Sequence, residues 1–330
     1  MNGADAVCFD SPANDNARRA RLYNGQILVF SARPSTIALC AHARQMIEQA
    51  FGGLDPLKAQ YEMPVEDYVA IVAPLKPKFI HNDTTKQLVR NILEDFGCDL
   101  DRSYQDVPRL RMVTSNSYLT SGVGYAHHMH RDTWYAAPQA QLNWWLPIWE
   151  FDSESAMAFH PRYWTDSVKN GSTEFNYYEW NAVGRASAAS QIKSDTRKQP
   201  RPLQEIDPDP QVRLVVPRGG VIMFSGAHMH STVPNSSGLT RYSIDFRTVN
   251  LDDVIAGRGA PNIDNSSTGT SLRDFRRARD NAPMPEEVVR PHDSGAPTSG
   301  VLVFDGNAAA AALAAQAKAV AEPVATSAGP

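Results

Sequence analysis

The sequence contains few cysteines, no long apolar run and no excess of positive charge. Three cysteines, Cys8, Cys40 and Cys98, are too few and too scattered for a disulfide framework or a thiolate metal site, so we expect a reducing cytoplasm. No apolar segment approaches the roughly 18–20 residues that a membrane span needs, and the N-terminus lacks the apolar core of a secretory signal. The net charge of −4 gives no basic footprint for nucleic acid. The remaining expectation is a soluble globular protein that binds neither membranes nor nucleic acid.

The chain is long enough, with 330 residues of which 42% are hydrophobic, for a sizeable core. Residues 1–20 are polar and predict a loose N-terminus. The Ala-rich, low-complexity residues 296–330 predict a tail without chemistry. We therefore expect one domain over residues 21–295.

Two helices are predicted in the first third of the chain. An apolar stripe from Ser35 to Phe51 follows Pro34, with Ser35 as the expected N-cap. A second helix is expected from Asp83, as its cap, to Phe96, where Gly97 ends it.

The pattern changes to short strands from about residue 109. Segments rich in β-branched and aromatic residues are bounded by Gly, Pro, Asn and Asp. They cover residues 109–116, 141–150, 155–161, 212–217, 220–224 and 240–249. The predicted fold class is mainly β with flanking helices. A polar insertion as long as 165–210 is more typical of a lid or a binding loop than of filler, and disorder is the alternative.

The first candidate site is the histidine-rich run GYAHHMHRDTWY at residues 124–135. Residues two apart in a strand point to the same face, so His130 and Asp132 would project together while Arg131 points away. His128 would join them only if the strand stayed regular, and a His128–His130 pair could serve a cupin-like site. His127 is expected to hydrogen-bond in a loop. An imidazole beside a carboxylate supplies two ligands for a divalent metal.

A second histidine cluster, GAHMHSTVPN at residues 226–235, follows the strand GVIMF. His228 and His230 would share a strand face, and we prefer His230 because of the residues that follow it. Two histidines and one carboxylate form the facial triad that leaves coordination positions open and is diagnostic of non-haem Fe(II) oxygenases.

Arg241 stands eleven residues after His230, in the strand TRYSIDFRTV. A turn at Pro234, Asn235 and Gly238 would bring it back beside the metal. Ser243 would point the same way. A guanidinium with a neighbouring hydroxyl is suited to bind a carboxylate.

These residues resemble the Fe(II)/2-oxoglutarate-dependent dioxygenases, and within them the phytanoyl-CoA dioxygenase family. The resemblance covers roughly residues 105–250. The matching elements are His130-Arg131-Asp132, the strand Gly219-Gly220-Val-Ile-Met-Phe224, and the run from His230 through Pro234-Asn235 and Ser237 to Arg241. One departure is Ser231, which stands where the family commonly has glycine.

The resemblance implies a double-stranded β-helix, a jelly-roll or cupin-like barrel. It implies that His130, Asp132 and His230 hold Fe(II), and that Arg241 grips 2-oxoglutarate with help from Thr232 or Ser243. Its reaction would consume O2 and release succinate and CO2. Halogenating relatives replace the aspartate with a small residue, so the presence of Asp132 disfavours halogenation.

Several other residues near the motifs have both a functional and a structural interpretation. Trp134 would point to the same strand face as His130, and it is either part of the wall around the substrate or 2-oxoglutarate or part of the barrel core. Gln141 and Asn143 share a face, and one could bind the C1 carboxylate of 2-oxoglutarate; both could equally lie on the surface. Arg111 and Arg247 could meet an anionic substrate, although an Arg247–Asp245 pair is the simpler expectation. His160 is expected to be a pocket or structural histidine.

The predicted function is a 2-oxoglutarate-dependent oxygenase that hydroxylates, or otherwise oxidises, an unactivated C–H bond of a small molecule. One alternative is a cupin-like Zn or Mn isomerase or hydrolase, which would use His128 with His130 and would not need Arg241. The other is a non-catalytic small-molecule-binding barrel. The sequence leaves the substrate and the oligomeric state open.

Overall fold

The structure is a computed structural model that describes residues 6–122, 127–184 and 195–293. Its strands are β1 (Val7–Phe9), β2 (Ile27–Phe30), β3 (Ser103–Gln105), β4 (Arg109–Val113), β5 (Leu142–Pro147), β6 (Met157–Phe159), β7 (Val212–Leu214), β8 (Val221–Ser225), β9 (His230–Thr232), β10 (Arg241–Asn250) and β11 (Arg276–Arg277). Its α-helices are α1 (Asp15–Tyr23), α2 (Pro34–Phe51), α3 (Val65–His81), α4 (Asp83–Asp95), α5 (Tyr177–Glu179), α6 (Leu251–Ile255) and α7 (Glu286–Val289). Within these residues, no helix combines the length and apolar character needed to cross a membrane.

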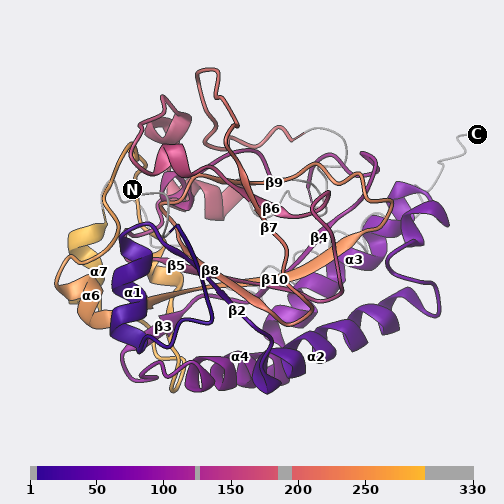
Figure 1. Cartoon of the computed structure of the whole chain (residues 1–330), viewed down its shortest axis with the longest axis horizontal. Coiled ribbons are helices and arrows are strands. Elements are labelled where there is room, and N and C mark those ends of the chain that lie inside the picture. The colour runs from indigo at the N-terminus through magenta and orange to yellow at the C-terminus, as the bar shows by residue number, and fades with distance from the viewer. Residues whose placement is uncertain (1–5, 123–126, 185–194, 294–330) are drawn as a thin grey trace, which may run out of the picture.

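The strands form two sheets. The larger runs β1-β2-β8-β5-β10-β3-β11, with β4 also paired to β10, and the smaller runs β7-β6-β9. Figure 1 shows α2, α3 and α4 along one side of the larger sheet, with β6, β7 and β9 on the other. The fold is therefore mixed α/β with two sheets. Among the described strands, the pairing between neighbours does not close into a barrel.

Side chains along the strands of the larger sheet alternate between its two faces, and each face packs into a different hydrophobic core. Trp145 of β5 packs with Phe224 of β8 and with Phe159 of the smaller sheet, so the odd-numbered face of β5 lies between the sheets. The neighbouring Trp144 faces the helices, where its ring lies 5.2 Å from that of Phe96. Because successive side chains in a strand point to opposite faces, this parity places other odd-numbered residues of β5 and β10 between the sheets. The candidate site is built on that inner face.

The prediction of a loose N-terminus was wrong for residues 6–20, the part of it that the structure describes. Within residues 1–20, β1 pairs in parallel with β2, and α1 begins at Asp15. Asn14 caps α1 by accepting a hydrogen bond of 3.0 Å from the backbone N–H of Ala17. The polar side chains that suggested a loose segment include Arg18 and Arg19, both of which are buried.

The two predicted helices are present, but their caps differ. The first begins at Pro34 after Arg33, so Ser35 lies inside the helix and is not its N-cap. Asn82, and not Asp83, caps the second helix by accepting from the backbone N–H of Thr85. Gly97 follows its end with a φ of 71°, a left-handed conformation that glycine adopts without strain.

Helix α3 was not predicted, because Pro74 and Pro77 lie inside it. The helix nevertheless forms, since Tyr68, Val72, Leu75 and Phe79 bury one face of it in the helical core.

The insertion at 165–210 carries only short helical turns in its described part, namely η4 (Gly171–Glu174), α5 and η5 (Trp180–Gly184). Its two ends are joined by backbone hydrogen bonds between Gly171 and Arg201 and between Lys169 and Leu203. The tail predicted at 296–330 lies outside the described residues.

Candidate active site

The side chains of His130, Asp132 and His230 meet from two distant segments. His130 and His230 exchange backbone hydrogen bonds of 3.0 Å in both directions, and their ring centres are 4.4 Å apart. Oδ1 of Asp132 lies 3.5 Å from Nε2 of His130 and 4.0 Å from Nε2 of His230. One ligand atom from each residue lies within 4.8 Å of the others, and all three residues are buried. This donor set fits a divalent metal bound by two imidazoles and one carboxylate.

Backbone carbonyls orient both imidazoles. Nδ1 of His130 lies 2.7 Å from the carbonyl oxygen of His128, and Nδ1 of His230 lies 3.0 Å from that of His228. A carbonyl can only accept, so each Nδ1 carries the proton and each Nε2 presents its lone pair. Burial, with the neighbouring His130 charge, lowers the pKa of His230 to about 3. The ring is therefore neutral near pH 7, as a metal ligand must be.

Three donors fix the carboxylate of Asp132. Its Oδ2 accepts from Nδ2 of Asn143 at 2.7 Å and from Nε2 of Gln141 at 2.9 Å. Nε of Arg247 lies 3.4 Å away. Burial alone would raise the pKa of Asp132, but the charge of Arg247 holds it well below the usual range. The carboxylate stays ionised, with Oδ1 nearest to the two histidines.

The predicted strand through the H-x-D motif is not formed. His130 makes an isolated bridge to His230, while Asp132 begins the short 3-10 helix η2 (Asp132–Tyr135). His130 and Asp132 converge because the chain turns between them. The prediction that Trp134 points to the same side as His130 and Asp132 assumed a regular strand, and it is therefore wrong. Trp134 is fully buried, packs against Tyr163 and Met229, and donates its indole N–H to Asp264 at 2.7 Å.

Arg241 and Ser243 are two buried residues of β10 with unsatisfied polar atoms. Both lie on the inner face of β10 and are buried. Nε and Nη1 of Arg241 and Oγ of Ser243 have no hydrogen-bond partner among the described residues. Burial lowers the pKa of Arg241 to about 10, which still leaves it charged at neutral pH. Because unpaired buried polar groups are costly, these atoms fit a carboxylate-bearing ligand such as 2-oxoglutarate.

The guanidinium of Arg241 also has an aromatic contact, with Cζ 5.3 Å from the ring centre of Trp145. Thr232 is buried on β9 two residues after His230, on the same strand face. The structure thus gathers His130, Asp132, His230, Arg241, Ser243 and Thr232 on the inner side of the sheets.

Asn143 and Gln141 are buried, which excludes the surface alternative. Their amide nitrogens are occupied by Asp132, so the structure gives Asn143 a role in holding this carboxylate. The expected Arg247–Asp245 pair is also wrong in detail. Arg111 binds Asp245 at 2.6 Å, and Arg247 lies between Asp106, at 3.2 Å, and Asp132.

The other histidines have separate contacts. Nε2 of His128 lies 2.9 Å from the carbonyl oxygen of Pro200, in the insertion. His160 lies between the carbonyl of Pro208, at 2.9 Å, and Oγ of Ser231, at 3.1 Å. The ring of His228 lies against that of Trp164, tilted by 38°, with ring centres 4.5 Å apart. Among the described residues, the three-member ligand cluster contains none of these three histidines.

Asp264 is a site-supporting residue that the sequence did not reveal. Nε of Arg131 lies 3.0 Å from its carboxylate, and the same guanidinium donates to the carbonyls of Ala227 and Tyr163. These bonds tie the H-x-D segment to the segment before His230. No local signal identifies Asp264, because it stands 133 residues from Arg131 in a polar loop.

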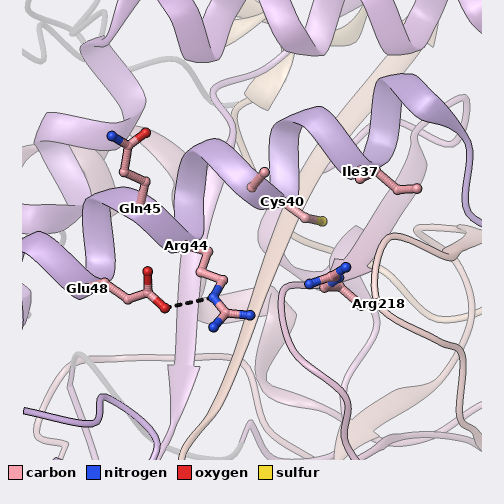
Figure 2. A pocket seen from close by; sticks show the side chains of 7 residues that line it. Ile37, Cys40, Arg44, Gln45, Glu48 and Arg218 are labelled. Atoms are coloured by element: carbon pink, nitrogen blue, oxygen red, sulfur yellow. Dashed lines mark hydrogen bonds and ion pairs between the residues drawn. The ribbon is translucent and has the colours of Figure 1, made fainter.

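A surface hollow of about 280 Å³ lies elsewhere, along α2. Figure 2 shows Arg44 donating to Glu48, with Cys40 and Arg218 nearby. Its lining residues include none of the candidate ligands. Because α2 covers the helical side of the larger sheet, the hollow is separate from the inner face that carries the site.

The family model for phytanoyl-CoA dioxygenase (PhyH) matches residues 48–243. The match spans more than half of the chain and includes the H-x-D motif, His230 and Arg241. The chain therefore belongs to the phytanoyl-CoA dioxygenase family. It is an enzyme of the iron- and 2-oxoglutarate-dependent oxygenase class. This assignment favours the oxygenase over the cupin-like hydrolase and the non-catalytic barrel.

Solved structures with a similar arrangement have low sequence identity. EvdO2 from Micromonospora carbonacea var. aurantiaca is 14% identical with a TM-score of 0.42, covering 74% of this chain and 94% of that one. The epimerase SnoN, in complex with Fe3+, alpha ketoglutarate and nogalamycin RO, is 14% identical with a TM-score of 0.38, covering 83% and 98%. No curated protein matches this chain.

Proposed function

We propose that this enzyme oxidises an unactivated C–H bond of a small molecule, most simply by hydroxylation, on a double-stranded β-helix scaffold. His130, Asp132 and His230 hold Fe(II). Arg241 and Ser243, assisted by Thr232, bind 2-oxoglutarate. When bound, iron and 2-oxoglutarate supply the oxidising chemistry with O2, releasing succinate and CO2.

The observation that carries this proposal is the pairing of a buried triad with an unsatisfied buried guanidinium. A structural metal site would not need Arg241, and an apolar core would not retain its charge without a partner. Two neutral imidazoles and one carboxylate leave an Fe(II) site with one net positive charge, which suits a dianionic co-substrate. The burial of all three ligands favours a small substrate over a folded macromolecule.

Each protein group has a separate task. The carbonyls of His128 and His228 fix the imidazole tautomers, so that both Nε2 atoms face the metal. Asn143 and Gln141 hold one oxygen of Asp132 and leave the other directed toward the histidines. The apolar core around Phe159 and Phe224 shields His230 from water.

The test combines a binding and a turnover measurement. Anaerobic addition of Fe(II) and 2-oxoglutarate should give a weak visible metal-to-ligand charge-transfer band, and O2 should then release succinate. His130→Ala, Asp132→Ala and His230→Ala should each abolish succinate formation. His228→Ala is the matched control and should retain the band. Normal turnover by His230→Ala would refute the ligand assignment and indicate His228 instead.

The substrate is identified by a screen scored on succinate release above the uncoupled background. Product mass then distinguishes hydroxylation from desaturation, because the first adds an oxygen atom and the second removes two hydrogens. Tight Zn2+ binding that survives Arg241→Ala, without the charge-transfer band, would support the cupin-like alternative.

A further inference from the structure

A group of cationic side chains continues from Arg241 across the inner face of β4 and β10. In the antiparallel pairing, Arg111 lies opposite Ser243 and Arg109 lies opposite Asp245. Directly opposite residues point to the same face of a sheet. Arg109 and Arg111 therefore share the face of Arg241 and Ser243. Arg247 extends the group toward Asp132.

The aspartates paired with Arg109, Arg111 and Arg247 are less exposed than these three arginines. Asp106 binds Arg109 at 2.6 Å and Arg247 at 3.2 Å, and only 4% of its side chain is exposed. The side chains of Arg109, Arg247 and Arg111 are 18%, 22% and 30% exposed. These three arginine side chains are therefore partly exposed, whereas the carboxylate that binds Arg109 and Arg247 is buried. Each arginine has five N–H donors, more than one carboxylate can satisfy.

Positive charge exceeds negative charge in this group. Among the described residues, the arginines of the group are Arg109, Arg111, Arg241 and Arg247, and its carboxylates are Asp106, Asp132 and Asp245. Lys76 of α3 adds a further cation near Arg111 and Asp245, although burial lowers its pKa to about 7. The Arg197–Asp195 pair is neutral. Fe(II) and dianionic 2-oxoglutarate cancel each other, so the surplus remains after both bind.

We propose that the primary substrate carries an anionic group, a carboxylate, sulfate or phosphate, bound by Arg109, Arg111 and Arg247. This inference rests on the proposed oxygenase function, because it places the substrate beside the same iron centre. A partly buried surplus of positive charge is unfavourable without a counter-charge. Arginine forks bind oxyanions bidentately. The contact between Arg247 and Asp132 places such an anion next to the metal site.

The experiment uses inorganic sulfate as the probe and the full-length protein loaded anaerobically with Fe(II) and 2-oxoglutarate. Sulfate is titrated at low ionic strength by calorimetry, while the charge-transfer band reports independently on the loaded site. The variants are Arg109→Gln and Arg111→Gln, with Arg109→Lys retaining the charge. Arg279→Gln is the matched control, because it removes one arginine from an exposed ion pair with Asp101.

We expect one sulfate to bind per loaded protein. Arg109→Gln and Arg111→Gln should each weaken it about tenfold, as expected for loss of one charged hydrogen bond. Arg109→Lys should lose less sulfate affinity than Arg109→Gln, and Arg279→Gln should bind sulfate like the wild type. Thermal unfolding identifies variants that fail to fold, and Arg109→Lys tests the same position with the charge kept.

Three results would overturn the proposal. The first is that the loaded protein binds no sulfate. The second is that Arg109→Gln and Arg111→Gln bind sulfate as tightly as the wild type does. The third is that 2-oxoglutarate abolishes sulfate binding. The second result would indicate an adventitious ion only, and the third would assign the cations to the co-substrate. Absence of the charge-transfer band is a different failure, which concerns the oxygenase function itself.

Discussion

Nδ2 of Asn143 donates a hydrogen bond of 2.7 Å to Oδ2 of Asp132, while Oδ1 of the same carboxylate lies nearest to the two histidines. The amide thus orients a candidate iron ligand from the neighbouring strand β5. Partners of this kind commonly change metal affinity by roughly ten- to hundredfold when they are removed.

We therefore predict that Asn143→Ala weakens Fe(II) binding by roughly tenfold or more. Anaerobic iron titration with the charge-transfer band as the readout measures this directly. Asn262→Ala, at an exposed position, is the control. If the variant instead bound iron normally and required more 2-oxoglutarate, Asn143 would be a contact of the co-substrate, as the sequence had left open.

Arg241→Ala should raise the 2-oxoglutarate concentration needed for half-maximal succinate formation on the order of a hundredfold, because a bidentate charged contact is lost. Arg241→Lys should fall between this variant and the wild type. Ser243→Ala should have a smaller effect, roughly fivefold. Iron affinity without 2-oxoglutarate should be unchanged in all three variants. An unaltered 2-oxoglutarate requirement in Arg241→Ala would exclude this residue as the clamp.

Asp264→Ala should destabilise the protein by about 3–5 kcal/mol, because the buried Arg131 loses its carboxylate partner. Urea unfolding measures the change. Asp101→Ala, which removes the carboxylate of an exposed ion pair, should leave the midpoint unchanged. A midpoint for Asp264→Ala equal to that of the wild type would show that the Arg131–Asp264 bond has no structural importance.

From the lowered pKa of Lys76 we predict that the free energy of unfolding depends on pH. Burial lowers its pKa to about 7, with the Arg111 charge acting in the same direction. The folded protein therefore binds fewer protons at this site than the unfolded chain between about pH 7 and 10.5, and the free energy of unfolding rises with pH across that window. Lys76→Met should stabilise the protein below pH 7, on the order of 2 kcal/mol, and progressively less as the pH rises.

Urea unfolding near pH 6 and near pH 10 compares Lys76→Met with Lys78→Met, which changes an exposed lysine on the same helix. The control should show no such trend. A stabilisation by Lys76→Met that is equal at both pH values would contradict a lowered pKa for Lys76.

The sequence allowed more accurate prediction of strands than of helix caps. The predicted strand segments overlap β4, β5, β6, β7, β8 and β10, because β-branched and aromatic runs between turn residues are local signals. The missed helix α3 contains Pro74 and Pro77, which locally disfavour a helix. Its burial against the sheet outweighs that preference, and burial depends on contacts that no short window of sequence contains.

By itself, the sequence determined which residues are candidates for the site. The types and spacing of His130, Asp132, His230 and Arg241 predict a two-histidine, one-carboxylate centre with a carboxylate-binding arginine, because ligand chemistry is a property of the side chains and their order. Only the tertiary structure decided how these groups are held. It assigned Asn143 to Asp132 and Asp264 to Arg131 because such partners are chosen by packing between segments far apart in the chain.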